Sequence, residues 1–301
     1  MTFKSLFANP ANAARHAGSG AGDFRSGTAY LFTPEMELAL SAAAATQRPL
    51  LVTGPAGCGK SSLARAAAAR LGWRYLERTV HSRTEVHSLL WEVDHLKRLQ
   101  DAHVKALDPD LLAYVRAAVL WEALDPASAR DPRSLRQLAA AQPGTQPGTL
   151  EPAVVLIDEI DKADPDLPNN LLEVLGGLRF EVADTGVRVA CRAGVPLIII
   201  TSNDERDLPP AFVRRCIALA LKQPDLATVG QLHFPNDGLL VGKAYALLAG
   251  GGTTPPSAAE FLDFVQACKE LEVAVGSADW LKLAEACVIK GRGGGADVRP
   301  A

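Results

Sequence analysis

The sequence predicts an α/β protein, with a parallel five-stranded sheet flanked by helices and a small C-terminal helical lid. Three observations support this prediction. Short apolar runs recur along the chain and end in polar residues, as buried strands of a parallel sheet do. A glycine-rich stretch joins one such run to an alanine-rich segment. Beyond residue 222, apolar residues recur at spacings of three and four, which is typical of amphipathic helices.

The bulk composition restricts the class of protein. The chain has 301 residues, of which 48% are hydrophobic, so a globular core can form. The formal net charge of -3 argues against general nucleic-acid binding. The longest bulky apolar run, Val195 to Ile200, is far shorter than the ~20 residues that cross a bilayer. Because residues 1–22 also lack a signal-type apolar core, we expect a soluble, cytoplasmic protein with no membrane partner.

The cysteines suggest a reducing compartment. All five are scattered, and none forms a C-x-x-C pair or a spacing typical of zinc ligands. Cys58 lies inside the glycine-rich stretch, where a redox switch is one interpretation. A small filler residue is the interpretation that we favour.

Changes in composition predict the domain boundaries. Residues 1–28, rich in Ala, Gly, Asn and Ser, are expected to form a flexible lead-in, and residues 29–222 the α/β core. Repeated Pro-Gly pairs predict an inserted loop over residues 126–150. Residues 223–290 are expected to form the helical lid, and residues 291–301 a tail.

The expected elements of the core follow from local patterns. Thr33 is a suitable N-cap for a helix from Pro34 to about Thr46. Apolar spacings predict two longer helices, over Thr84 to Leu107 and Leu111 to Leu124. The strands are expected over residues 49–53, 73–80, 153–157, 196–203 and 217–221.

The glycine-rich loop (Gly54-Pro55-Ala56-Gly57-Cys58-Gly59-Lys60-Ser61) matches the pattern G-x-x-x-x-G-K-[ST] and is followed by Ser62. The alternative is a glycine-rich turn with a chance Lys-Ser pair. The strand before it and the helix after it favour a phosphate-binding loop, because backbone N–H groups and a helix N-terminus attract anions. We expect these nine residues to bind ATP, with Lys60 on the β- and γ-phosphates and Ser61 on Mg²⁺.

A second polar cluster follows the apolar run Ala153 to Ile157. Adjacent carboxylates at the end of a buried strand are costly unless they face a cation or a reacting water. With a phosphate-binding loop in the same chain, we expect Asp158 to orient the Mg²⁺ shell and Glu159 to polarise the attacking water. The alternative is a charged loop after a strand.

These two motifs together resemble the AAA+ ATPases, and most closely their MoxR-like branch. The resemblance covers roughly residues 28–265. It rests on Leu156 to Ala163, on Pro168 to Leu175, and on Arg179 to Val182 followed by Asp184-Thr185-Gly186. It implies a P-loop AAA+ core, in which the latter segments form a helix and a short hairpin. It also implies a homo-oligomeric ring, expected to be a hexamer, and a protein client or a partner with a von Willebrand-type domain.

The resemblance implies three further site residues. Asn203 follows the apolar strand 196–203 and matches the sensor that holds the attacking water or the γ-phosphate. Leu208 to Cys216 resembles the arginine-finger segment, with Arg215 preferred as the finger and Arg214 as the alternative. Relatives carry a basic second-sensor residue ahead of a Pro-Ser pair, but in this chain no Arg or Lys lies directly before Pro256. Lys243 and Lys269 are possible substitutes that no motif supports.

The sequence therefore predicts Mg²⁺-dependent ATP hydrolysis coupled to remodelling or chaperone-like activation of a protein client. One alternative is a slow nucleotide-binding switch or scaffold, supported by the missing second-sensor residue. Another is a nucleic-acid-stimulated motor, against which the mild acidity argues. A GTPase is disfavoured because the chain has no Asn-Lys-x-Asp motif.

Overall fold

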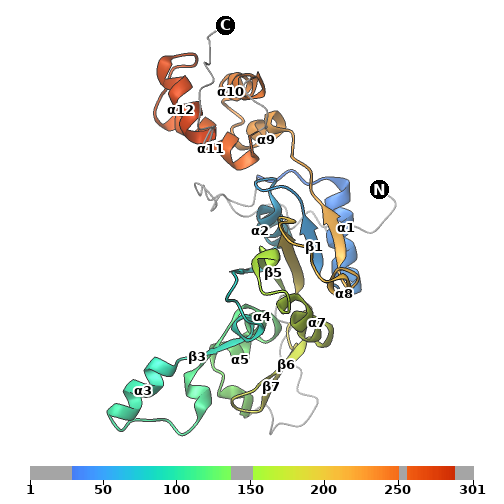
Figure 1. Ribbon diagram of the computed structural model, residues 1–301, viewed down its shortest axis with the longest axis vertical. Coiled ribbons are helices and arrows are strands. Elements are labelled where there is room, and N and C mark those ends of the chain that lie inside the picture. The colour runs from blue at the N-terminus through green and yellow to red at the C-terminus, as the bar shows by residue number, and fades with distance from the viewer. Residues whose placement is uncertain (1–28, 137–151, 251–255, 289–301) are drawn as a thin grey trace. The chain divides into compact units, whose positions relative to one another are not determined.

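The computed structural model describes residues 29–136, 152–250 and 256–288 (Figure 1). The expected lead-in over residues 1–28 and tail over residues 291–301 lie outside these ranges. The described chain divides into two compact units. The first contains Thr33–Thr53 and Ala67–Ala220, and the second contains Gly54–Ala66, residues 29–32 and the chain from Leu221 onward.

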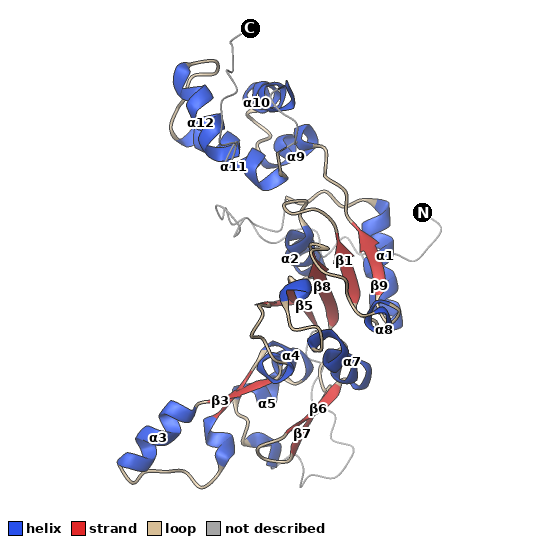
Figure 2. Cartoon of the chain, in the orientation of Figure 1, coloured by secondary structure: helices blue, strands red, loops and turns tan. Residues whose placement is uncertain are grey.

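The first unit is built on the predicted parallel sheet of five strands (Figure 2). Its order is β2-β5-β8-β1-β9, and all four neighbouring pairs are parallel. The strands are β1 (Leu50–Thr53), β2 (Arg74–Thr79), β5 (Ala153–Asp158), β8 (Leu197–Ser202) and β9 (Ile217–Ala220). The central strands β5 and β8 are buried almost throughout, which explains their continuous apolar sequences.

Helices pack on this sheet from within the same unit. Helix α1 (Pro34–Thr46) contacts β1 and β9, and α4 (Val119–Leu124) contacts β2 and β5. The predicted N-cap is confirmed, since the Thr33 hydroxyl accepts the Met36 N–H at 3.3 Å. Helix α2 (Lys60–Leu71) follows the glycine-rich loop, and α8 (Pro210–Val213) precedes β9.

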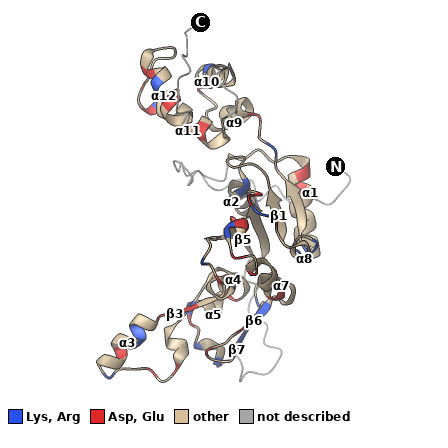
Figure 3. Ribbon diagram, viewed as in Figure 1, with Lys and Arg blue, Asp and Glu red and all other residues tan. Residues whose placement is uncertain are grey.

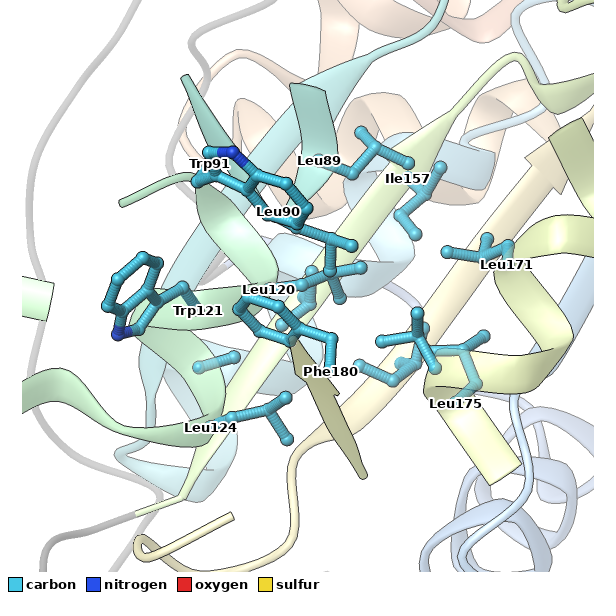
Figure 4. Packing of buried hydrophobic residues seen from close by; sticks show 14 of the residues in the cluster. Leu89, Leu90, Trp91, Leu120, Trp121, Leu124, Ile157, Leu171, Leu175 and Phe180 are labelled. Carbon is cyan, nitrogen blue, oxygen red and sulfur yellow. The ribbon is translucent and has the colours of Figure 1, made fainter. Parts of the chain in front are cut away.

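The resemblance correctly implied a helix and a hairpin after β5. The 3₁₀-helix η5 (Ile160–Lys162) is followed by α7 (Leu167–Gly177) and an antiparallel pair, β6 (Arg179–Val182) and β7 (Val187–Ala190). Phe180 on β6 stacks on Trp91 with ring centroids 5.7 Å apart, and Trp121 meets the same ring edge-on (Figure 4). This hairpin is therefore anchored by aromatic packing in the core of the first unit.

The two long helices predicted between β2 and β5 are wrong. Residues 84–107 form η3 (Val86–Leu89), β3 (Trp91–Val93) and α3 (His95–His103). Residues 111–124 form η4 (Leu111–Tyr114), β4 (Val115–Ala117) and α4. Strands β3 and β4 pair antiparallel, and this pairing between distant residues overrides the helical spacing of the apolar side chains.

The inserted loop predicted over residues 126–150 also needs correction. Residues Pro126–Arg130 form α5, which the Asp125 side chain caps by accepting the Ser128 N–H at 3.3 Å. Ser128 is buried, and its hydroxyl accepts the Trp121 indole N–H at 2.8 Å. Residues 137–150 of the predicted loop lie outside the described residues.

From Leu221 onward, the described residues of the second unit form four helices: α9 (Leu226–His233), α10 (Gly238–Gly250), α11 (Ala258–Glu270) and α12 (Ala278–Val288). They share a separate apolar core, in which Phe264 meets Trp280 edge-on at 4.9 Å. These helices agree with the amphipathic spacing that the sequence shows beyond residue 222. Within the described ranges, the structure holds no helix with the length and apolar content to cross a membrane.

Candidate functional site

The glycine-rich loop follows β1 directly and leads into α2, as predicted. Gly57 has φ +73°, a left-handed conformation that favours glycine. A Cβ atom at Gly54, whose φ is +142°, would lie 2.4 Å from the Leu221 carbonyl oxygen. Glycine is therefore required at these positions both by the backbone conformation and by the close approach of the chain.

Lys60 is nearly buried, with 6% of its surface exposed. Its Nζ donates hydrogen bonds to the carbonyl oxygens of Gly54 at 2.7 Å and Pro55 at 3.0 Å. The ammonium is thus held against the start of the loop by neutral acceptors. A phosphate oxygen is a stronger partner for an ammonium than a carbonyl oxygen is, so these bonds can be exchanged for contacts with an anion.

Tyr30 is a loop contact that sequence reasoning missed. Its hydroxyl donates to the Gly59 carbonyl oxygen at 3.2 Å, and its ring meets Phe32 edge-on at 5.2 Å. Burial raises the pKa of Tyr30, so the phenol stays protonated and remains a donor. No motif marks this residue, because the contact joins segments 29 residues apart.

The first turn of α11 lies against the same loop. The Ala258 N–H donates to the Gly57 carbonyl oxygen at 3.3 Å. Ser257 caps α11 in a reciprocal arrangement with Glu260. Of the two possible second-sensor lysines, Lys269 donates to Asp237 at 2.7 Å and Lys243 is exposed.

Asp158 and Glu159 stand at the carboxyl end of β5, in the first unit. Thr201, on the neighbouring strand β8, sets their positions. Sequence reasoning also missed this residue. The Thr201 hydroxyl donates to the Asp158 carboxylate and accepts the Glu159 backbone N–H at 3.0 Å. Thr201 is fully buried, so no water competes for these bonds. The sequence offered one signal for Thr201, namely its place two residues before Asn203 on a neighbouring parallel strand.

Glu159 and Asn203, both expected to act on the attacking water, lie together in the structure. The Asn203 side-chain amide donates to Glu159 Oε1 at 3.4 Å, and Lys162 Nζ donates to the same oxygen at 2.8 Å. The hydrogen bond to Glu159 raises the pKa of Lys162, so its ammonium stays charged. Glu159 itself has φ +61°, a left-handed conformation uncommon for a side chain with a Cβ atom.

Asp161 organises the loop after β8. One of its carboxylate oxygens accepts the backbone N–H groups of Asn203 and Glu205, each at 3.1 Å. Asp161 is 3% exposed, and its other oxygen has no hydrogen-bond partner among the described residues. The buried carboxylate therefore fixes the backbone at Asn203, whose side chain meets Glu159.

Arg214 and Arg215 follow α8 and are exposed. The Arg214 carbonyl oxygen accepts a hydrogen bond from the Arg48 guanidinium at 3.4 Å, which fixes the backbone at the end of α8. Neither guanidinium forms an ion pair with any residue in the part of the chain that the structure describes. Both are therefore open to an outside partner, and the choice between them stays a prediction.

Comparisons with known proteins agree with this fold. No curated protein matched the sequence. Among solved structures, the chain is similar to NtrX from Brucella abortus in complex with ATP, with a TM-score of 0.50 and 15% identity. That match covers 86% of this chain and 57% of the NtrX chain.

Two further solved structures have lower scores. NtrX from Brucella abortus in complex with ADP has a TM-score of 0.47 and 14% identity, over 84% of this chain and 55% of that chain. A RuvB point mutant from Thermotoga maritima has a TM-score of 0.42 and 15% identity, over 84% and 68%. The chain thus spans little more than half of the NtrX length. The family model of the AAA domain (dynein-related subfamily) matches residues 49–216, which are more than half of the 301 residues. The chain therefore belongs to this family.

Proposed function

We propose that the chain is a Mg²⁺-dependent ATP hydrolase of the MoxR-like type, which acts as a ring in the cytoplasm and remodels a protein client. The arrangement of Glu159 is the observation that supports hydrolysis most strongly. Its backbone is held by buried Thr201, and its carboxylate meets the Asn203 amide at 3.4 Å. A fixed carboxylate beside a fixed amide is a suitable device for orienting a water molecule.

In this proposal the nucleophile is water, and the protein supplies positioning and charge. Glu159 takes the proton of the attacking water, while the Asn203 amide binds that water or an oxygen of the γ-phosphate. The Lys162 ammonium, 2.8 Å from the Glu159 carboxylate, restrains the carboxylate when no nucleotide is bound. Asp161 sets the position of Asn203 through the backbone.

The glycine-rich loop binds the phosphates in this proposal. On binding ATP, the Lys60 ammonium leaves the carbonyl oxygens of Gly54 and Pro55 for phosphate oxygens. Backbone N–H groups at the start of α2 add to this attraction. ATP is proposed over GTP because the sequence lacks the Asn-Lys-x-Asp motif.

The residues present fit a Mg²⁺ ion bound together with nucleotide. Ser61 and Asp158 offer a hydroxyl and a carboxylate, which are the oxygen ligands that Mg²⁺ prefers. Within the described ranges, no group of three or more His, Cys, Asp or Glu side chains is placed to hold a metal ion. Mg²⁺ would thus complete its shell with phosphate oxygens and water, and when bound it would neutralise charge on the β- and γ-phosphates.

The proposed ring follows from the arginines after α8. Arg215, or Arg214 in its place, would reach the nucleotide of the neighbouring subunit and stabilise the charge of the transferring phosphoryl group. A homo-oligomer, proposed to be a hexamer, is then required for hydrolysis. A partner with a von Willebrand-type domain remains the proposed class of associated protein.

One observation favours a second candidate, a slow nucleotide-binding switch. No basic residue precedes Pro256, and Lys269 is engaged by Asp237 on the lid. The second-sensor contact would then be missing, and turnover would be slow. A measurement of whether hydrolysis requires assembly distinguishes the ring-forming hydrolase from the slow switch.

The experiment measures phosphate release per chain across a range of chain concentrations, alongside the oligomeric state by light scattering. We expect the rate per chain to rise as the ring assembles. Competition of ATP against GTP for binding is measured on the same samples. A dilute monomer that hydrolyses ATP as fast as the assembled protein would contradict the ring, and turnover near zero at every concentration would favour the switch.

A further inference from the structure

The segment between β3 and β4 forms an arm on the first unit, with α3 beyond the β3–β4 ladder (Figure 1). None of the nine residues of α3 is buried. A helix of this length is marginal in water by itself. It is held by the Asp94 cap, whose carboxylate accepts the Lys97 N–H at 2.8 Å, and by contacts with Tyr114 on η4.

The polarity of α3 is the reverse of that in an ordinary surface helix. Its inward face is polar, since Asp101 accepts the Tyr114 hydroxyl at 3.0 Å and the Lys97 ammonium lies 5.7 Å from the centre of the same ring. At 3.6 residues per turn, Leu99 lies about 160° around the helix from both of these residues. The helix therefore turns leucine away from its own chain.

The apolar side chains outside this contact are well exposed. Leu96 is 67% exposed and Leu99 is 57% exposed, and the segment after the helix adds Val104 at 72% and Leu107 at 46%. Four large apolar residues within twelve positions form an exposed cluster, whereas single exposed apolar residues need no explanation. We name Leu96, Arg98, Leu99, Val104, Lys105 and Leu107 the arm surface.

Three acidic residues near this surface form ion pairs, and Asp101 on α3 accepts the Tyr114 hydroxyl on the face turned away from Leu99. Asp94 pairs with Arg116, Asp108 with Arg133 at 2.9 Å, and Asp110 with Arg136 at 2.8 Å. The bond to Arg136 also holds the pKa of Asp110 below its usual value. By contrast, Arg98 and Lys105 form no ion pair with any described residue. Figure 3 shows both basic and acidic positions on α3.

We propose that the arm surface binds an acidic amphipathic segment of a protein partner, with apolar side chains against the leucines and carboxylates against Arg98 and Lys105. The inference goes beyond the proposed function, since it rests on the arm alone and requires no hydrolysis. Four exposed apolar residues disfavour a nucleic acid, whose backbone attracts only the cations. Two unpaired cations on this surface are too few to hold so short a helix on an anionic membrane.

The test is fluorescence anisotropy with a labelled helical peptide that carries leucines at positions i, i+3, i+4 and i+7 and glutamates elsewhere on its surface. We expect the full chain to bind this peptide, and Leu96→Ser/Leu99→Ser to weaken binding at least about tenfold. Arg98→Glu/Lys105→Glu should weaken it similarly and should improve binding of the matched peptide with lysine in place of glutamate. Leu239→Ser is the control, because Leu239 is 78% exposed on α10 in the second unit.

Several outcomes overturn the proposal. The absence of binding by the wild-type chain does so, as does binding that the arm variants leave unchanged. Tighter binding to phosphatidylserine vesicles or to single-stranded DNA, lost in the arm variants, assigns the surface to those ligands instead. A change of oligomeric state in Leu96→Ser/Leu99→Ser assigns it to contacts between copies of the chain. ATP hydrolysis by each variant is measured in parallel, so failure of the proposed function is recognised separately.

Discussion

The Thr201 hydroxyl accepts the backbone N–H of Glu159 at 3.0 Å, and this bond joins β8 to the turn that carries the proposed base. The same hydroxyl donates to Asp158. One buried threonine thus sets the positions of the two acidic residues to which different roles are assigned. Glu159 keeps its left-handed backbone at this point because a specific bond compensates for the strain.

Replacement of Thr201 by valine removes the hydroxyl and preserves the shape. The Glu159 N–H loses its acceptor in a buried place, which costs about 1–3 kcal/mol of unfolding free energy. We expect kcat for ATP hydrolysis to fall at least about tenfold, as loss of one positioning bond does. Urea unfolding and steady-state phosphate release measure the two effects. Thr201→Ser should restore most of both, and Thr79→Val, at an exposed position on β2, is the control.

Asp161 offers a test of backbone positioning. In the wild-type chain, the N–H groups of Asn203 and Glu205 each lie 3.1 Å from a carboxylate oxygen of Asp161. Asp161→Ala leaves both N–H groups without this acceptor. We expect a loss of about 1–3 kcal/mol in stability and a lower kcat with nearly unchanged KM, since Asp161 acts through Asn203, which is proposed to serve the reacting water and γ-phosphate and not the rest of the nucleotide. A raised KM with unchanged kcat would show that Asp161 does not act through Asn203.

Gly57 tests the contact between the glycine-rich loop and α11. In Gly57→Ala the new methyl group would lie 2.3 Å from the Ser257 Cβ, at a residue whose φ is +73°. We expect a loss of about 1–3 kcal/mol in stability and weaker ATP binding. The double variant Gly57→Ala/Ser257→Gly should recover the part of the stability and of the ATP binding that is lost through the overlap of the two side chains. Gly242→Ala, with open space around it on α10, should instead stabilise the chain by about 0.5–1 kcal/mol.

Cys58 tests the redox interpretation of the loop. Burial raises its pKa, and this effect exceeds the opposing influence of the Lys60 ammonium. A raised pKa means less thiolate at neutral pH than in a free cysteine, so alkylation by iodoacetamide should be slow at pH 7 and should accelerate as the pH rises above 9.0, the ordinary value. The rate is followed by mass spectrometry. Faster reaction than free N-acetylcysteine at pH 7 would support a redox switch.

The two arginines after α8 test the shared site. Arg215→Ala should retain ATP binding and lose hydrolysis at concentrations where the wild-type chain is assembled, and the same result for Arg214→Ala alone would reassign the finger. Mixing either variant with Glu159→Gln discriminates further. If the finger acts on a neighbour, each mixed ring contains some complete sites, and part of the activity should return.

The sequence correctly predicted the sheet, because its central strands β5 and β8 are buried and their apolar runs can be read without tertiary information. Glu159 and Asn203 were both expected to act on the attacking water, but the hydrogen bond between their side chains was not predicted. Thr201, Asp161 and Tyr30 were not predicted, because their roles depend on contacts between segments far apart in the chain.

The segment between β2 and β5 was predicted incorrectly for a related reason. Leu89 and Leu90 are buried in the core, whereas Leu96 and Leu99 are exposed on α3, yet all fit one helical spacing. Spacing alone cannot separate apolar residues that face a core from those that face outward. The β3–β4 pairing, which divides the two groups, links residues more than twenty positions apart.

The most direct test of the proposed function is the steady-state ATPase rate of Glu159→Gln with Mg²⁺, compared with the wild-type chain at the same assembled concentration. Glutamine keeps the shape of the side chain but cannot accept the proton of the attacking water. We expect a loss of at least about a hundredfold in rate, with ATP affinity retained. Glu173→Gln, at an exposed position on α7, should match the wild type. Hydrolysis by Glu159→Gln at the wild-type rate would contradict the central claim.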